Sequence, residues 1–349
     1  MKNKHLDGHQ DRLLQQNINM NPTRIELELT EQCNLACRFC YNSQKPIISG
    51  LASEIIKRLS EENVMEIVLT GGEPMIHPQF KEILAECCAI FSKVMVQTNG
   101  TYITEEYAQL FSDQGIFGVN ISLHGMRAAH ESLTCVQGSY DSAIRGIKSL
   151  LAHHVRLASN FVLTNENVAS LEETIDYLYT LGLREITLTR FTPTGVGMSN
   201  SNLAISRKIL NNVLRLAEKK RRAYKGLHII MANSVPYCGL DHDLKMFCEY
   251  CHFGTSRFYV DVNGNVLMCG MSRVKLGNIF DASFKNIKDG SLIYKKHVCG
   301  ADVPEMCMQC KDFDLCRGGC RAAAYARTNS LDGADPYSVF HEKLERNDC

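Results

Sequence analysis

The chain has 349 residues, of which 45% are hydrophobic and 22% charged, enough for one large domain or for a large and a smaller one. Lysine plus arginine equals aspartate plus glutamate at 38 each, so no net charge favours nucleic acid or an acidic membrane surface. No apolar run approaches the roughly 20 residues of a membrane-spanning helix, and no signal segment opens the chain. We therefore expect a cytoplasmic protein that binds neither nucleic acid nor membranes.

After a polar lead-in over residues 1–22, short β-rich runs alternate with amphipathic helices up to about residue 225. Helical periodicity is clearest at 139–154 and 167–182, and Gly182 stands at the C-cap of the second stretch. Six successive β–α units predict parallel strands joined by right-handed crossovers, in a barrel or an open wound sheet. The predicted strands are 24–30, 66–72, 93–100, 118–125, 157–164 and 184–191.

Chemically distinctive residues follow four of these strands. They are the segment 33–40 after the first, the segment 71–74 after the second, Asn99 after the third and Ser122 on the fourth. In both architectures the active site lies at the carboxyl ends of the strands, so we expect these groups to converge on one rim.

The sixteen cysteines stand out in the composition. Without an export signal the thiols stay reduced, so clustered cysteines indicate metal binding or catalysis. Cys33, Cys37 and Cys40 are three thiols that cannot all pair in disulfides, and a zinc site would need a fourth nearby ligand. Three thiolates that hold three irons of a cubane, with the fourth iron left open, fit the spacing.

The string CNLACRFCY, residues 33–41, resembles the cysteine-x3-cysteine-x-aromatic-cysteine signature of the radical S-adenosylmethionine (SAM) superfamily, with Phe39 as the aromatic residue. The resemblance implies a partial (β/α)6 TIM-like barrel over residues 23–225 and a [4Fe–4S] cluster whose open iron binds SAM. One electron from the cluster would split SAM and give a 5′-deoxyadenosyl radical that takes a hydrogen atom from substrate. A reductant such as flavodoxin or ferredoxin is implied as a partner.

The string TGGEPMIHP, residues 70–78, resembles the glycine-rich SAM motif of the same superfamily. The resemblance places Gly71, Gly72, Glu73 and Pro74 at the cofactor. The two glycines would let the backbone approach the methionine moiety, and Glu73 would balance the ammonium charge of SAM. A turn before a helix is the alternative reading of this motif taken alone.

Three further positions match places where relatives contact SAM or supply a polar group. They are Asn99, Ser122 and Asn160, each of which could instead simply end a strand. His124 and His130 could act as acid or base, with a satisfied loop histidine as the alternative.

From about residue 226 helical periodicity fades, and cysteines recur among glycine-rich turns. This pattern predicts a second, loop-rich domain over 226–349 whose order depends on bound metal. Its cysteines resemble the SPASM extension of some radical SAM enzymes, which carries auxiliary iron–sulfur clusters. The resemblance assigns one cluster to Cys248, Cys251, Cys269 and Cys320, and a second to Cys307, Cys310 and Cys316. Two zinc ribbons built on CEYC and CMQC are the alternative.

The chain departs from the family pattern at the last ligand. Relatives have a cysteine in a DP-x-C context, whereas here the context is ADPYS and Ser338 takes that place. Cys349, Ser338 or an open iron would complete the second auxiliary cluster, and the sequence leaves all three open. Cys135 follows the fourth strand, where we consider a role as hydrogen donor; Cys87 and Cys88 read as core residues.

SPASM relatives mostly modify ribosomally made peptides or proteins, which makes a peptide the expected substrate. Only some 23 residues precede the first strand, so a separate leader-binding protein is a possible partner. Gly270 after Cys269 argues against sulfatase maturation, in which relatives place an aspartate there. Tetrapyrrole or haem maturation is the alternative activity. An iron–sulfur carrier or a zinc-bound interaction protein is the non-enzymatic alternative.

Overall fold

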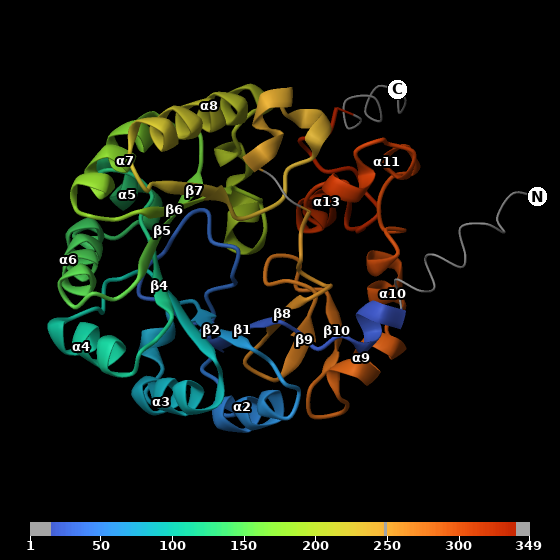
Figure 1. Cartoon of the computed structure of the whole chain (residues 1–349), viewed down its shortest axis with the longest axis horizontal. Helices are drawn as coiled ribbons and strands as arrows, with labels where there is room; N and C mark the ends of the chain where they lie inside the picture. The colour runs from blue at the N-terminus through green and yellow to red at the C-terminus, as the bar shows by residue number, and fades with distance from the viewer. Residues whose placement is uncertain (1–14, 248–249, 340–349) are drawn as a thin grey trace, which may run out of the picture.

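The structure is a computed structural model of the chain and describes residues 15–247 and 250–339. Its centre is a ten-stranded sheet in the order β10-β9-β8-β1-β2-β3-β4-β5-β6-β7, which curves into a partial barrel (Figure 1). The strands are β1 (Arg24–Thr30), β2 (Glu66–Gly71), β3 (Lys93–Thr98), β4 (Gly118–Ser122), β5 (Leu157–Leu163), β6 (Glu185–Arg190), β7 (His228–Met231), β8 (Arg257–Val260), β9 (Asn265–Leu267) and β10 (Lys275–Asn278). The strands in the run β8-β1-β2-β3-β4-β5-β6-β7 pair in parallel. The strands in the run β8-β9-β10 pair antiparallel.

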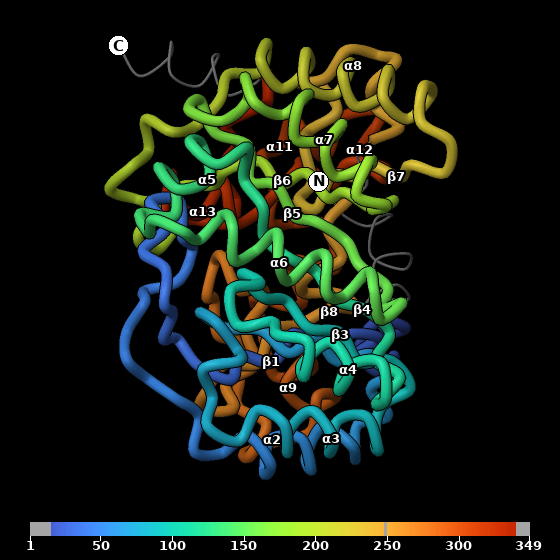
Figure 2. Tube along the Cα trace, turned by 90° about the vertical axis from the view of Figure 1, so that its left-hand side faces the viewer, coloured from blue at the N-terminus to red at the C-terminus, as the bar shows by residue number. Residues whose placement is uncertain are grey.

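The helices of the β–α units cover the outside of the barrel (Figure 1). They are α2 (Ala52–Ser60), α3 (Phe80–Ile90), α4 (Glu105–Asp113), α5 (Arg127–Thr134), α6 (Ser139–Ala152), α7 (Leu171–Thr180) and α8 (Arg207–Ala223). Seen from the side in Figure 2, α4 and α6 lie in front of the strands that they cover. None of the helices in the described ranges is both long and apolar enough to span a bilayer.

The C-terminal part adds five short helices to the hairpin of β8, β9 and β10. They are α9 (Phe284–Gly290), α10 (Leu292–Val298), α11 (Glu305–Met308), α12 (Phe313–Cys316) and α13 (Arg321–Thr328). This part is loop-rich, as predicted, but it is not separated from the barrel sheet, because β8 pairs with β1 from Arg24↔Arg257 to Leu27↔Val260. One buried core contains side chains from both parts, for example Ile25 and Phe258.

The predicted α/β fold with six β–α units is confirmed, and the differences are local. Strands β3 and β4 end at Thr98 and Ser122, earlier than predicted, before Gly100 and Gly125 turn the chain with φ of 79° and 136°. Strand β7 was not predicted. It has four residues, of which His228 and Ile230 are exposed, so it carries little of the apolar run that marks a buried strand.

The last residues of the lead-in pack against the C-terminal part. Residues 15–19 are helical, and Ile18 is buried in the core. The Lys288 ammonium group donates to the carbonyl oxygens of Asn17, at 3.0 Å, and Met20, and the Tyr294 hydroxyl also donates to Asn17. The beginning of the described chain is therefore fastened beside α9 and α10 (Figure 1).

Candidate active site

A cavity of about 310 Å³ opens at the carboxyl ends of the barrel strands. Most of the residues that the sequence placed on this rim line it. They are Cys33, Cys37, Cys40, Gly71, Gly72, Asn99, Ser122 and Asn160. Most of them end or follow one of the strands β1 to β4, and Asn160 lies in the middle of β5, so the parallel sheet itself brings them together.

The loop after β1 that carries Cys33, Cys37 and Cys40 is called the cysteine loop. Its backbone N–H groups point at its own sulfur atoms. Leu35 N donates to Cys33 Sγ at 3.4 Å, and Asn42 N donates to Cys40 Sγ at 3.4 Å. Asn99 Nδ2 is 3.7 Å from Cys33 Sγ, so a side chain after β3 also approaches the sulfur. Such hydrogen bonds favour the thiolate form and tune a bound cluster.

Helix α5 holds the cysteine loop in place from outside the sheet. Ala36 N donates to the Thr134 carbonyl oxygen at 3.0 Å, and Arg38 N donates to the Leu133 carbonyl oxygen at 2.9 Å. The loop shape therefore depends on backbone contacts with the end of α5.

The three thiols of the loop need a positive partner to ionise. Burial raises the pKa of Cys33 to about 11 and raises the pKa values of Cys37 and Cys40 as well, and Cys33 and Cys40 further raise the pKa of Cys37. Within the described ranges no three His, Cys, Asp or Glu side chains are grouped to hold one metal ion. The irons of a cubane cluster bind thiolates and would supply the positive charge, which suits three half-buried thiols that line one cavity.

Gly71 and Gly72 are required by the packing of β2 against the cysteine loop. A Cβ atom at Gly71, where φ is 147°, would collide with the Thr30 carbonyl oxygen, and one at Gly72 would collide with the Gln32 carbonyl oxygen. Gly72 N donates to Thr30 O at 2.7 Å, and Glu73 N donates to Gln32 O at 2.9 Å. The glycines thus seat the cysteine loop as well as lining the cavity.

Glu73 lies just behind the cavity wall and is fully buried. Its carboxylate accepts hydrogen bonds from Thr98 Oγ1 at 2.8 Å, Asn99 N at 2.8 Å and Met75 N at 3.2 Å. Pro74 is the first residue of the 3-10 helix η1 (Pro74–Ile76) that Glu73 caps. Burial raises the pKa of Glu73 to about 7. In this structure Glu73 fixes the end of β3, and its pairing with the SAM ammonium group stays a proposal.

Several polar atoms in the cavity wall have no hydrogen-bond partner among the described residues. They are Asn120 Oδ1, His130 Nε2 and Thr192 Oγ1. Buried polar groups are normally paired, so such atoms fit a polar ligand such as the ribose or adenine of SAM. The Asn160 side chain already has one hydrogen-bond partner within the protein, because its Oδ1 accepts from Thr189 Oγ1 at 2.7 Å.

His124 and His130 hold the loop after β4 in place. His124 N donates to His130 Nδ1 at 3.1 Å, and Val162 N donates to His124 Nδ1 at 3.2 Å. Burial lowers the pKa of His124 well below its usual range and that of His130 to about 4. Both rings are neutral at neutral pH. Both Nδ1 atoms accept backbone hydrogen bonds, as expected of loop histidines, whereas Nε2 of His130 has no partner among the described residues.

Cysteines of the predicted first auxiliary site line the same cavity from the C-terminal side. They are Cys251, Cys269 and Cys320, while Cys248 lies outside the described residues. Ser272 N donates to Cys269 Sγ at 3.3 Å. Burial raises the pKa of the Cys251 thiol, and Cys320 and Cys269 raise it further, because the sulfur atoms are close together. The sequence did not predict that both cysteine groups share one cavity.

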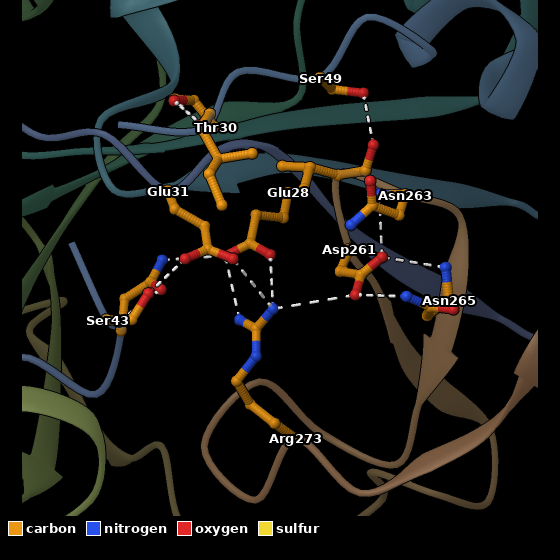
Figure 3. A network of polar contacts seen from close by, with 12 residues as sticks. Glu28, Thr30, Glu31, Ser43, Ser49, Asp261, Asn263, Asn265 and Arg273 are labelled. Atoms are coloured by element: carbon orange, nitrogen blue, oxygen red, sulfur yellow. Dashed lines mark hydrogen bonds and ion pairs between the residues drawn. The ribbon is translucent and has the colours of Figure 1, made fainter. Parts of the chain in front are cut away.

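An ion-pair network that sequence reasoning missed ties the two parts of the site together (Figure 3). The Arg273 guanidinium contacts Glu28 at 3.1 and 3.2 Å, Glu31 at 3.6 Å and Asp261 at 3.9 Å. Asn42 Nδ2, just after the cysteine loop, also donates to Glu28 at 2.9 Å. The signal in the sequence was Glu28 itself, a carboxylate in a buried strand that needs a cationic partner.

A second missed ion pair links β6 to the ADPYS loop. Arg190 and Asp335 are both almost fully buried, and Arg190 Nη1 donates to Asp335 Oδ1 at 2.9 Å. Asp335 also accepts from Cys320 N at 2.8 Å and from Tyr337 N at 2.8 Å. This carboxylate therefore positions a cavity cysteine and the loop that carries Ser338.

Cys135, Cys307, Cys310 and Cys316 do not belong to the residues that line the cavity. Cys307 and Cys316 are buried and Cys310 is half-buried, while Cys349 lies outside the described residues. Cys135 is exposed at the left-handed C-cap of α5, and its Sγ is 3.6 Å from the Ser132 carbonyl oxygen. It still lies near enough to Cys37 to raise the pKa of that thiol.

Residues 27–178 match the radical SAM superfamily, and residues 251–317 match SPASM, an iron–sulfur cluster-binding domain. Among curated proteins, the chain is 28% identical to mycofactocin maturase MftC of Mycolicibacterium smegmatis over 91% of this chain and 83% of that protein. It is 24% identical to the AdoMet-dependent heme synthase of Methanosarcina barkeri over 91% and 97%. It is 25% identical to the PqqA peptide cyclase of Gluconobacter oxydans over 93% of each chain.

Solved structures share the fold. Streptococcus suis SuiB bound to S-adenosylmethionine superposes with a TM-score of 0.75 at 16% identity, covering 94% of this chain and 80% of SuiB. The AdoMet-bound anSMEcpe superposes with a TM-score of 0.72 at 22% identity, covering 92% and 95%. The two domain matches fall on the barrel and on the C-terminal cysteines in that order, so the chain is a radical SAM superfamily enzyme with a C-terminal SPASM domain.

Proposed function

We propose that this enzyme modifies a ribosomally made peptide by hydrogen abstraction at the barrel cavity. The observation that carries the proposal is the shared cavity of about 310 Å³, which is lined both by Cys33, Cys37 and Cys40 and by three cysteines of the SPASM region, Cys251, Cys269 and Cys320. A substrate bound there would lie between the SAM site and an auxiliary cluster, which suits an oxidation in which an electron leaves the substrate.

When bound, the [4Fe–4S] cluster and SAM supply a 5′-deoxyadenosyl radical that takes a hydrogen atom from substrate. We assign Cys33, Cys37 and Cys40 to the cluster. Gly71 and Gly72 shape the floor beside it, while the unpaired atoms of Asn120 and Thr192 are free for a polar ligand. Apolar side chains in the same wall limit access of water to a radical. They are Leu35, Phe39, Val162, Phe191 and Phe253.

Relatives support a peptide as the substrate class. Their names include mycofactocin maturase, sporulation killing factor maturation protein and PqqA peptide cyclase, and SuiB is solved with its precursor peptide SuiA. We propose a separate leader-binding protein as partner and a flavodoxin or ferredoxin as reductant. The auxiliary clusters would be bound by Cys248, Cys251, Cys269 and Cys320, and by a second set that includes Cys307, Cys310 and Cys316.

Haem maturation is the second candidate, favoured by the AdoMet-dependent heme synthases among the relatives. Sulfatase-type maturation has less support. A Cβ atom at Gly270 would lie 2.8 Å from the Tyr259 ring, so an aspartate at this position would displace that ring.

The test has two steps. Anaerobically reconstituted protein with dithionite and SAM should yield 5′-deoxyadenosine, and the Cys33→Ala variant should not. An iron–sulfur carrier would yield none in either case.

The substrate is then identified by mass spectrometry after co-expression with a short peptide encoded near the gene. Loss of two hydrogens from the peptide supports the proposal. If the peptide stays unmodified and an added iron porphyrin is decarboxylated, the result would contradict peptide modification and support haem maturation.

A further inference from the structure

The segment between β7 and the C-terminal cysteines contains a cysteine that the family pattern does not include. Residues Tyr237–Gly239 form the 3-10 turn η4, with Cys238 at its centre. A Cβ atom at Gly239 would collide with the Tyr337 carbonyl oxygen, and one at Gly319 would lie 2.8 Å from Pro236 Cδ. The turn therefore packs between the end of the cysteine run, residues 307–320, and the ADPYS loop, residues 334–338.

Two sulfur contacts place this turn at the second auxiliary site. Tyr237 N donates to Cys316 Sγ at 3.3 Å. Cys238 Sγ lies 3.4 Å from Ser338 Oγ. Ser338 is 2% exposed and occupies the position at which the family pattern has its last cysteine. Cys238 Sγ therefore lies in contact with the Ser338 hydroxyl, which stands where the family pattern has its last cysteine ligand.

The exposure of these cysteines suits a buried site. Cys307 and Cys316 are buried, and Cys238 and Cys310 are half-buried. Because the residue just before Cys238 donates its backbone N–H to Cys316 Sγ, the turn brings Cys238 close to the cysteines of residues 307–320.

We propose that Cys238 is the fourth ligand of the second auxiliary cluster and that Ser338 is its hydrogen-bond partner. Iron–sulfur clusters are held by thiolates, and a serine hydroxyl is far less acidic than a thiol. Four thiolates leave no open iron at this cluster. The assignment concerns residues away from the cavity lining and holds whichever substrate the enzyme modifies.

The experiment uses the full chain with Cys33, Cys37 and Cys40 replaced by alanine, so that only the auxiliary clusters remain. Anaerobic reconstitution should then load about eight irons per chain, as two four-iron clusters. Adding Cys238→Ala should lower the content to about four irons, or to about seven with the EPR signal of a three-iron cluster. Adding Cys88→Ala, a half-buried cysteine on helix α3, should leave about eight irons.

A rescue separates ligation from folding. Ser338→Cys added to Cys238→Ala places a thiol next to the lost one and should restore the full iron content. Retention of both clusters in Cys238→Ala, or their loss in Cys349→Ala, would overturn the assignment. If Cys238→Ala does not fold, Cys238→Ser replaces it, and an unchanged EPR spectrum of its reduced clusters would count against Cys238 as a ligand.

Discussion

The cysteine loop of the barrel and the proposed second auxiliary site both gather several thiols, but they are assembled differently. Cys33, Cys37 and Cys40 lie on one loop after β1, held by backbone hydrogen bonds from the end of α5. Cys238 comes from a segment far in sequence from Cys307 and Cys316, and tertiary contacts with Cys316 and Ser338 hold the turn that carries it. The first site depends on local structure and the second on long-range packing, so the two should fail under different substitutions.

The largest effect is expected at the local site. Cys37→Ala leaves two thiolates for a cluster that needs three, so 5′-deoxyadenosine formation should fall by at least about a thousandfold. The auxiliary clusters should keep their iron, because their ligands lie on other segments. Iron content and product are measured on the same sample, with Cys88→Ala as the control. Parallel loss of auxiliary iron would show that the two sites are not independent.

Asp335→Ala should break the long-range site and spare the local one. It leaves the buried Arg190 charge unpaired and removes the acceptor for Cys320 N, so the protein should lose about 3–5 kcal/mol of stability. Auxiliary iron should fall while the cluster on the cysteine loop remains. Anaerobic melting and iron analysis measure both effects.

The control for Asp335→Ala is Glu185→Ala, which breaks an exposed pair with Arg156 and should cost no more than about 1 kcal/mol. An equal loss of stability in the two variants would contradict the view that the buried pair organises the auxiliary site.

Glu73, beside the cysteine loop, should make the stability of the folded protein depend on pH. Its folded-state pKa of about 7 lies above the ordinary value of 4.5, so the folded protein holds a proton that the unfolded chain releases. Stability should therefore fall as the pH rises from about 4.5 and should level off above about pH 7; between pH 6 and pH 8 the fall is about 1 kcal/mol, most of it below pH 7. Melting temperatures of wild type and Glu73→Gln without SAM are compared. Parallel pH profiles would show that Glu73 does not titrate in this range.

The smallest effect is expected for Cys135→Ala. Cys135 is exposed and does not belong to the residues that line the cavity, so product formation should change less than about twofold, as for a surface substitution. A loss of product with normal 5′-deoxyadenosine yield would instead restore its role as hydrogen donor.

Local patterns predicted most of the barrel and its rim. The strand runs alternate with helical periodicity, and in a parallel sheet the residues after each strand meet at one edge, which located Cys33, Gly71, Asn99 and Ser122. Strand β7 was missed because only part of it is buried.

Partners set by contacts across the whole chain could not be predicted in the same way. Arg273 meets Glu28 and Asp335 meets Arg190 only through tertiary packing, and Cys238 stands outside the motif spacing. For the same reason the sequence left the last ligand of the second auxiliary cluster open.

The pairing of β1 with β8 has a consequence for synthesis of the protein on the ribosome. Strand β1 emerges first, but its outer edge is covered, and Glu28 meets Arg273, only after the C-terminal hairpin has been made. Until then the nascent barrel exposes a strand edge and an unpaired carboxylate, which are features that favour aggregation and chaperone binding. Closure of the sheet, and final seating of the loop that follows β1, thus wait until the chain has been translated past Arg273.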